Sequence, residues 1–127
     1  MTGDGARTWV FADGFLPQKG EGGGYHGHDA LCIVNTGTEE ARLLLDLYFE
    51  DRACQEGIPL LVPGQRSLHL RMDRPEQLGG YTLPREVPYS ARLRSNVPVV
   101  AQYSRLDVTQ ANLALMTSLG FAVPGER

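Results

Sequence analysis

The 127-residue sequence predicts an all-β protein: a single-domain antiparallel β-sandwich, jelly-roll-like, with about eight strands. Short segments alternate apolar and polar residues, which is typical of strands with one buried face. Glycine (15 residues) and proline (8 residues) separate these segments where turns are expected. The length is sufficient for one hydrophobic core without disulfides, and neither a repeat nor a linker divides residues 1–127.

Three strands are predicted in the first half of the chain. Residues 8–12 place Trp9 and Phe11 on one face. His28–Asn35 is apolar on both faces, which is typical of a central strand. Ala41–Phe49 follows a polar turn and alternates leucines with charged residues, so one face should be buried and the other solvated.

The second half continues this pattern around a long loop. Residues 72–88 combine proline, glycine and charged residues without periodicity, and we predict a loop there. Residues 111–121 suit a strand by their alternation and a helix by their Ala, Leu and Met content. We predict a strand because the surrounding protein is all β. Residues 123–127 should form a flexible tail. The remaining predicted strands are 58–62, 66–72, 89–95 and 97–105.

The most informative segment for function is residues 95–107. An apolar run ends in Gln102, Arg105 and Asp107, which bring an amide, a guanidinium and a carboxylate close to a buried strand. These groups need partners, because an unpaired buried charge costs several kcal/mol. The partner is either another protein group or a ligand.

Together with polar residues of other strands, this cluster predicts a pocket for a small polar ligand, a sugar or sugar acid. Trp9 would stack on an apolar sugar face, while Arg105 and Gln102 would hold a carboxylate or hydroxyls. Asp107 would pair with an arginine and orient it. An Arg105→Ala variant should lose the ligand and keep the fold. The alternative is a buried polar network that fixes strand register. The candidate ligand-binding residues are Trp9, Asp13, His28, Asn35, Arg66, Gln102, Arg105 and Asp107.

Catalytic and metal sites have weaker support. His26 and His28 are two residues apart, and with His69 they could form the ligand set of a cupin-like metal enzyme. His26 belongs to a glycine-rich loop, however, and we predict no metal and no cofactor. The glycines of residues 20–24 lack the Lys-Ser/Thr of a P-loop, and no G-x-S-x-G motif is present. We therefore predict no catalytic residue.

Charge and cysteine content suggest the compartment and the partners. The net charge of −3 argues against a dedicated nucleic-acid-binding protein. Arg92 and Arg94 form an outward stripe that would suit nucleic acid, but a solvated face or a subunit interface explains it equally well. Two cysteines without CxxC spacing, and the lack of a signal peptide or bilayer-spanning segment, predict a cytoplasmic protein with free thiols and no membrane insertion.

Four segments resemble motifs of the sensory-rhodopsin transducer family, a set of small soluble prokaryotic proteins. The resemblance follows the chain in order and covers nearly all of it. It implies an antiparallel β-sandwich that assembles as a homotetramer and binds rather than catalyses. The matching segments are residues 9–17, 28–37, 62–66 and 95–107, with further matching positions up to 118.

These observations favour a non-enzymatic signalling or binding protein. It would hold a small sugar-like ligand and pass that state to a partner. The alternative is a transducer that contacts a membrane photoreceptor tail, which the resemblance implies, or that binds DNA as a transcription-linked regulator. A cupin-like metal enzyme is the third hypothesis.

Overall fold

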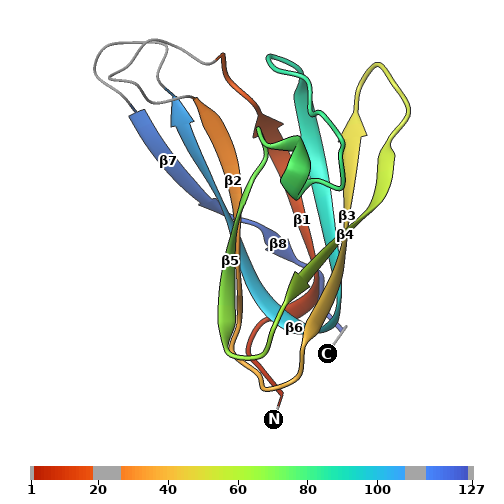
Figure 1. Cartoon of the computed structure of the whole chain (residues 1–127), viewed down its shortest axis with the longest axis vertical. Helices are drawn as coiled ribbons and strands as arrows, with labels where there is room; N and C mark the ends of the chain where they lie inside the picture. Colours follow the sequence, from red (N-terminus) through yellow and green to blue (C-terminus); the bar gives the residue numbers. More distant parts are fainter. Residues whose placement is uncertain (1, 19–26, 108–113, 126–127) are drawn as a thin grey trace.

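The computed structural model describes residues 2–18, 27–107 and 114–125. Its eight antiparallel strands are linked by hydrogen bonds into one sheet that folds over itself as a two-layer sandwich (Figure 1). The predicted all-β fold class is therefore confirmed. The elements are β1 (Ala6–Phe15), β2 (His28–Asn35), β3 (Ala41–Phe49), β4 (Gln55–Val62), β5 (Arg66–Arg71), the 3-10 helix η1 (Pro75–Gln77), β6 (Pro88–Asp107), β7 (Ala114–Leu119) and β8 (Phe121–Ala122).

Strand β6 belongs to both layers. Its first half pairs with β1 and β3, in the layer ordered β4-β3-β6-β1-β8. Its second half pairs with β2 and β7, and β5 completes this second layer beside β2. We predicted two strands, 89–95 and 97–105, but the structure has one strand of 20 residues. Pro98 is tolerated within it because residues 96–98 cross between the layers and have no ladder partner in the described parts of the chain.

The core lies between the layers and follows the predicted alternation. Leu43, Leu45 and Leu47 of β3 point inward and are at most 1% exposed. The predicted loop at 72–88 also contributes to the core, because Leu78 and Leu83 are buried. Figure 1 shows η1 between the two layers at the end where they diverge. This loop therefore closes one end of the sandwich.

The strand predicted at 111–121 is present as β7 and β8, which are separated by Gly120. A Cβ at Gly120 would lie 2.5 Å from the Phe11 ring, so only glycine permits this close approach. Val123, placed in the predicted tail, donates its N–H to the Thr8 carbonyl at 3.0 Å and thereby extends the contact with β1. In the ranges the structure describes, no helix is long and apolar enough to span a bilayer.

Candidate functional site

Asp29 is the polar centre of the sandwich end where Phe15 lies. Its carboxylate is fully buried and accepts three hydrogen bonds. Arg105 Nε donates to Oδ1 at 2.8 Å, while the Phe15 N–H and the Tyr89 hydroxyl donate to Oδ2 at 3.0 and 2.8 Å. One side chain of β2 thus holds β1 and both halves of β6 together.

Two tyrosines extend this centre toward the core. The Tyr103 hydroxyl contacts the Tyr89 hydroxyl, which in turn donates to Asp29. Burial raises the pKa of Asp29, although Arg105 and the Phe15 N–H oppose the shift. Burial and the neighbouring Asp29 charge raise the pKa of Tyr103 well above its ordinary value. Tyr103 is therefore protonated at neutral pH and can donate to Tyr89.

Asp29 orients Arg105 but bonds to only one of its three guanidinium nitrogens. Its side chain is 18% exposed, and its guanidinium lies 5.8 Å from the centre of the Phe15 ring. Only Nε forms a hydrogen bond, so in the described part of the chain both terminal nitrogens, Nη1 and Nη2, lack an acceptor. No fully buried side-chain nitrogen or oxygen among those residues is unpaired, so Nη1 and Nη2 reach solvent.

A cleft of about 280 Å³ opens beside Arg105, between β6, β7 and the end of β1. Asp13 brings a carboxylate to the same cleft without forming an ion pair with Arg105. Met116, which faces Arg105 across the β6–β7 ladder, supplies an apolar wall. The cleft thus combines one cation, one anion and hydroxyl groups with an apolar surface. The lining residues are Asp13, Tyr103, Ser104, Arg105, Met116, Thr117 and Ser118.

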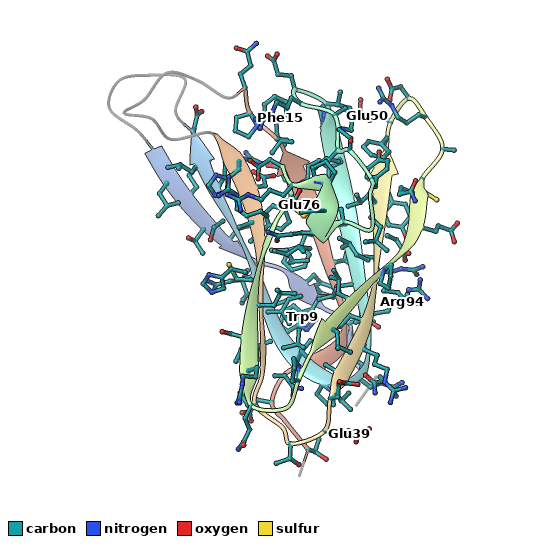
Figure 2. All side chains as sticks on the ribbon, viewed as in Figure 1. Trp9, Phe15, Glu39, Glu50, Glu76 and Arg94 are labelled. Carbon is teal, nitrogen blue, oxygen red and sulfur yellow. The ribbon has the colours of Figure 1, made fainter. Side chains whose placement is uncertain are left out.

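Two of the eight predicted site residues, Asp13 and Arg105, therefore share a cleft. Trp9 lies in the core between the layers (Figure 2) and is 6% exposed. Its indole N–H is shared by the carbonyls of Ala6 and Val99 at 3.1 and 2.9 Å. With this burial, Trp9 packs the core and does not line the cleft.

Asn35 is fully buried at the opposite end of β2. Its amide donates to the Glu39 and Val62 carbonyls at 2.8 and 3.1 Å, and its Oδ1 accepts the Gly37 N–H at 3.1 Å. These bonds fix the β2–β3 turn against the end of β4, so Asn35 also lies outside the Arg105 cleft.

The other four predicted residues lie elsewhere. Gln102 is three residues from Arg105, an odd spacing that puts it on the opposite, exposed face of β6. Arg66 is exposed at the start of β5, and its Nη1 donates to the Gln65 carbonyl at 3.1 Å. His28 and Asp107 stand at the ends of β2 and β6, opposite Leu106 and Ala114 respectively.

The sequence prediction missed Asp29 as the partner of Arg105 and named Asp107 for that type of role. A signal was present, because Asp29 is in phase with Leu31 and Ile33 on the inward face of β2. A carboxylate at that position had to be buried and therefore had to be paired. The contact between Tyr89 and Tyr103, 14 residues apart on one strand, had no comparable signal.

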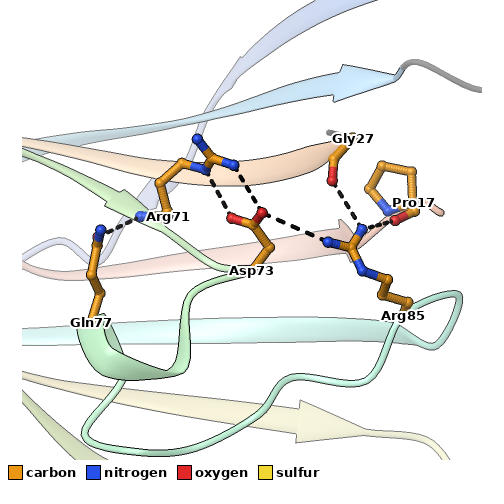
Figure 3. Close-up of polar contacts among 6 residues, drawn as sticks. All are labelled: Pro17, Gly27, Arg71, Asp73, Gln77 and Arg85. Carbon is orange, nitrogen blue, oxygen red and sulfur yellow. Dashed lines mark hydrogen bonds and ion pairs between the residues drawn. The ribbon is translucent and has the colours of Figure 1, made fainter. Parts of the chain in front are cut away.

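A second carboxylate, Asp73, lies at the centre of a cluster of polar contacts (Figure 3). Arg71 binds it through two hydrogen bonds of 2.8 Å, and Arg85 lies 3.7 Å from Oδ2. Arg85 also donates to the carbonyls of Pro17 and Gly27, the latter at 2.9 Å. Asp73 thus positions Arg85, and Arg85 links Pro17 to Gly27, which are close together in space although residues 19–26 separate them in the sequence.

A third carboxylate, Asp46, lies beneath Arg92 and Arg94 on the outer face of the first layer. Although Asp46 is on the face of β3 opposite the core leucines, its side chain is 0% exposed. Arg94 donates to it twice, at 3.1 and 3.0 Å, and Arg92 Nε donates at 3.2 Å. Burial disfavours its charge, but the hydrogen bonds from Arg94, Gly57 and Arg92 together hold the pKa of Asp46 below its ordinary value.

The residues that the structure describes contain no group of three potential metal ligands. His69 lies opposite Cys32, four residues along β2 from His28. His26, which the metal hypothesis requires, is outside the described residues.

Comparisons with known proteins agree with the motifs. The family model of the Anabaena sensory rhodopsin transducer matches residues 4–122. The crystal structure of Thermotoga maritima 1070 is similar, with 41% identity over 97% of this chain and 99% of that one, and a TM-score of 0.85. The Anabaena sensory rhodopsin transducer itself is 27% identical over 81% of this chain and 84% of its own, with a TM-score of 0.68. A search of curated proteins gave no match. The chain therefore belongs to the Anabaena sensory rhodopsin transducer family.

Proposed function

We propose that this protein is a non-enzymatic signalling domain that binds a small sugar-acid-like ligand in the Arg105 cleft and passes that state to a partner. The observation that supports the proposal is the guanidinium of Arg105. Asp29 and Phe15 fix its orientation, yet its two terminal nitrogens lack acceptors among the described residues, and Arg105 lines the cleft. A planar carboxylate is the natural acceptor for such a fork. Asp13 would accept hydroxyls of the same ligand.

The cleft is linked to the rest of the fold through the same arginine. A ligand carboxylate at Arg105 would weaken its attraction for Asp29, which also binds Tyr89 and the Phe15 N–H in the other layer. Occupancy would thus alter contacts in both layers. That is the kind of two-site linkage that signalling requires.

Binding is favoured over catalysis by the state of the thiols. A hydrogen bond from the Cys54 thiol to Glu56 raises the pKa of Cys54, which disfavours the reactive thiolate. Cys32 lies within β2 and is also free. Free thiols fit a reducing compartment, so the cytoplasm is the proposed location.

The proposed partners are further copies of this chain and a membrane photoreceptor, the class that family membership favours. Self-association is supported by β7, which in residues 2–18, 27–107 and 114–125 pairs with β6 alone and so forms an edge. Nearby apolar side chains are strongly exposed, including Leu115 and Leu119 at 71% and Phe121 at 65%. An uncharged apolar edge of this kind invites pairing with another strand. A homotetramer would bury these side chains.

The DNA alternative has less support from the geometry. Arg92 and Arg94, the residues that would contact phosphates, already share the Asp46 carboxylate. Their combined charge is therefore partly neutralised, which weakens the electrostatic attraction that DNA binding needs.

Thermal unfolding with sugar acids tests the ligand proposal. Glucuronate or gluconate should raise the melting temperature of the wild type, because a ligand bound only to the folded state stabilises it. Glucose, which lacks the carboxylate, should do so less. Arg105→Lys should lose the shift, since lysine keeps a charge near Asp29 but removes the fork. Arg94→Lys, on the outer face, should retain it and serves as the matched control.

We choose Arg105→Lys rather than Arg105→Ala because Asp29 needs a positively charged partner. Our sequence-based expectation was that Arg105→Ala keeps the fold. The structure predicts otherwise, because this variant leaves the buried Asp29 carboxylate without its charged partner, at a cost of about 3–5 kcal/mol. If no sugar acid shifts the wild type, or if Arg105→Lys shifts as much as the wild type, the ligand proposal is wrong.

A further inference from the structure

A second cleft lies at the opposite end of the sandwich. Figure 2 shows Glu39 at this end and Phe15 at the other. The cleft measures about 290 Å³ and is formed by the N-terminal segment, the β2–β3 turn and the part of β6 that crosses between the layers. Its polar lining includes Arg7, Asn35, Glu39 and Asn96, and none of these residues touches the Arg105 cleft.

The walls of this second cleft are held by a hydrogen-bond network. Asn35 fixes the β2–β3 turn through the bonds described above, including the one to the Glu39 carbonyl. Thr36 docks the N-terminal segment on that turn, because its hydroxyl accepts the Asp4 N–H at 2.8 Å and donates to the Asp4 carboxylate at 2.9 Å. Asn96 accepts the Arg42 N–H at 2.7 Å. A site of this kind is pre-formed, which lowers the cost of binding.

Two opposite charges line the second cleft without pairing. Arg7 Nε donates to the Ser95 carbonyl at 3.3 Å, and its terminal nitrogens have no acceptor among the described residues. The Glu39 carboxylate forms no hydrogen bond or ion pair within that same part of the chain. The neighbouring Arg42 and Glu40, by contrast, pair with each other at 3.4 Å. Arg7 and Glu39 therefore line the same cleft with opposite charges and without an ion pair between them.

We propose that the second cleft binds a small zwitterion of the chemical class of free amino acids. The Arg7 guanidinium would bind the carboxylate, and Glu39 would bind the ammonium group. Glu39 disfavours simple anions and Arg7 disfavours simple cations, so the pair selects a molecule that carries both charges. Val97 and Pro98 of β6 provide apolar contact for the aliphatic part. The volume suits a ligand of this size.

Isothermal titration calorimetry with individual free L-amino acids tests this site. At least one amino acid should bind the wild type. Its N-acetyl derivative, which lacks the ammonium, and its amide, which lacks the carboxylate, should each bind about tenfold more weakly or worse. Arg7→Gln and Glu39→Gln should show the same loss, while their melting temperatures stay near that of the wild type because both side chains are exposed.

The controls separate this site from its surroundings. Arg42→Gln and Glu40→Gln remove charges at the same end but outside the cleft, and they should bind as the wild type does. Arg105→Lys should also bind normally, so failure of the sugar-acid proposal would leave this result intact. The zwitterion proposal is overturned if no amino acid binds, if the two derivatives bind as well as their parent, or if Arg105→Lys loses binding while Arg7→Gln keeps it.

Discussion

At the scale of single residues, three aspartates fix the positions of five arginines. Asp29 holds Arg105, Asp46 holds Arg92 and Arg94, and Asp73 holds Arg71 and Arg85. Arg52 differs, because it pairs with its exposed neighbour Asp51 on the surface. The three sites share a design in which a carboxylate with little or no exposure fixes a guanidinium that reaches further out. This requires a planar fork with several donors, which fits a chain that contains a single lysine.

Asp46 and Asp29 should respond to acid in opposite ways, because the pKa of Asp46 is lowered and that of Asp29 is raised. Hydrogen bonds hold the pKa of Asp46 below its ordinary 3.8, so Asp46 adds stability above that pH and the contribution is lost as the pH falls through its folded-state value. Asp46→Asn should lower the free energy of unfolding by about 1–3 kcal/mol at neutral pH. The deficit should shrink as the pH falls below 3.8. Urea unfolding of both proteins between neutral and acid pH measures this difference.

Asp29 serves as the control, because its contribution to stability should change with pH in the opposite direction. Burial raises its pKa above 3.8, so its contribution to stability grows as the pH falls through the folded-state pKa toward 3.8. Relative to an Asp29→Asn variant, the wild type should therefore gain stability over that interval. Parallel pH profiles for the two variants would contradict the assignment of the two environments.

At the scale of elements, the start of β1 depends on one glycine. Gly5 has a φ of +104°, and a Cβ there would lie 2.0 Å from the Val99 carbonyl oxygen. The same oxygen accepts the Trp9 indole N–H, so β1 and the crossing part of β6 approach each other closely at this point. Side chains are excluded here both by backbone conformation and by space.

Gly5→Ala should destabilise the protein by more than 2 kcal/mol, at the upper end of single-residue effects, as estimated from strain plus displaced packing (~1–3 kcal/mol each). Gly80→Ala is the matched control. Gly80 also has a positive φ, +90°, but nothing lies within 4 Å of its Cβ position. Chemical denaturation should therefore give a clearly larger loss at position 5. Equal losses would mean that strain alone matters and the contact with Val99 does not.

Sequence periodicity predicted strands correctly where apolar and polar residues alternate strongly. It did not predict features that depend on how the strands pack in three dimensions. Alternation located β2 and β3 at their observed bounds. The strands predicted at 89–95 and 97–105 are one strand, β6, and the sequence does not show that a strand passes between layers there. The candidate site was predicted as one cluster, yet its residues divide between the Arg105 cleft, the core and the opposite end of the sandwich. Residue type identified polar groups, but only the register of β6 against β2 and β7 decides which of them meet.

At the scale of the whole molecule, the second layer ends in strand β7, whose outer edge no other described strand covers. Leu115, Leu119 and Phe121 are exposed within seven residues, and β7 offers its outer backbone groups for pairing. Charged residues, which usually protect such edges, are missing from Ala114–Leu119. The Arg105 cleft lies beside this edge, because Met116 and Ser118 form its wall. Assembly at β7 would therefore enclose the cleft further.

Charges placed on this edge should disrupt the proposed assembly. Leu115→Lys combined with Leu119→Lys should shift the wild-type species to a smaller mass in light scattering, because each lysine would have to be desolvated at the interface. Leu61→Lys is the control, since Leu61 is 53% exposed on β4 at the other side of the molecule. A wild type that is monomeric at micromolar concentration, or a double variant with unchanged mass, would refute assembly through β7.

The sharing of β6 between layers also affects how the chain can be synthesised. Strands β1, β2 and β3 all lie in the first half of the chain, but each pairs with β6, which begins only at Pro88. A nascent chain that has not yet released β6 from the ribosome can complete neither layer, since the contacts it needs are distant in sequence. Its apolar strands must therefore stay unpaired until most of the protein has emerged, which exposes them to aggregation during that interval.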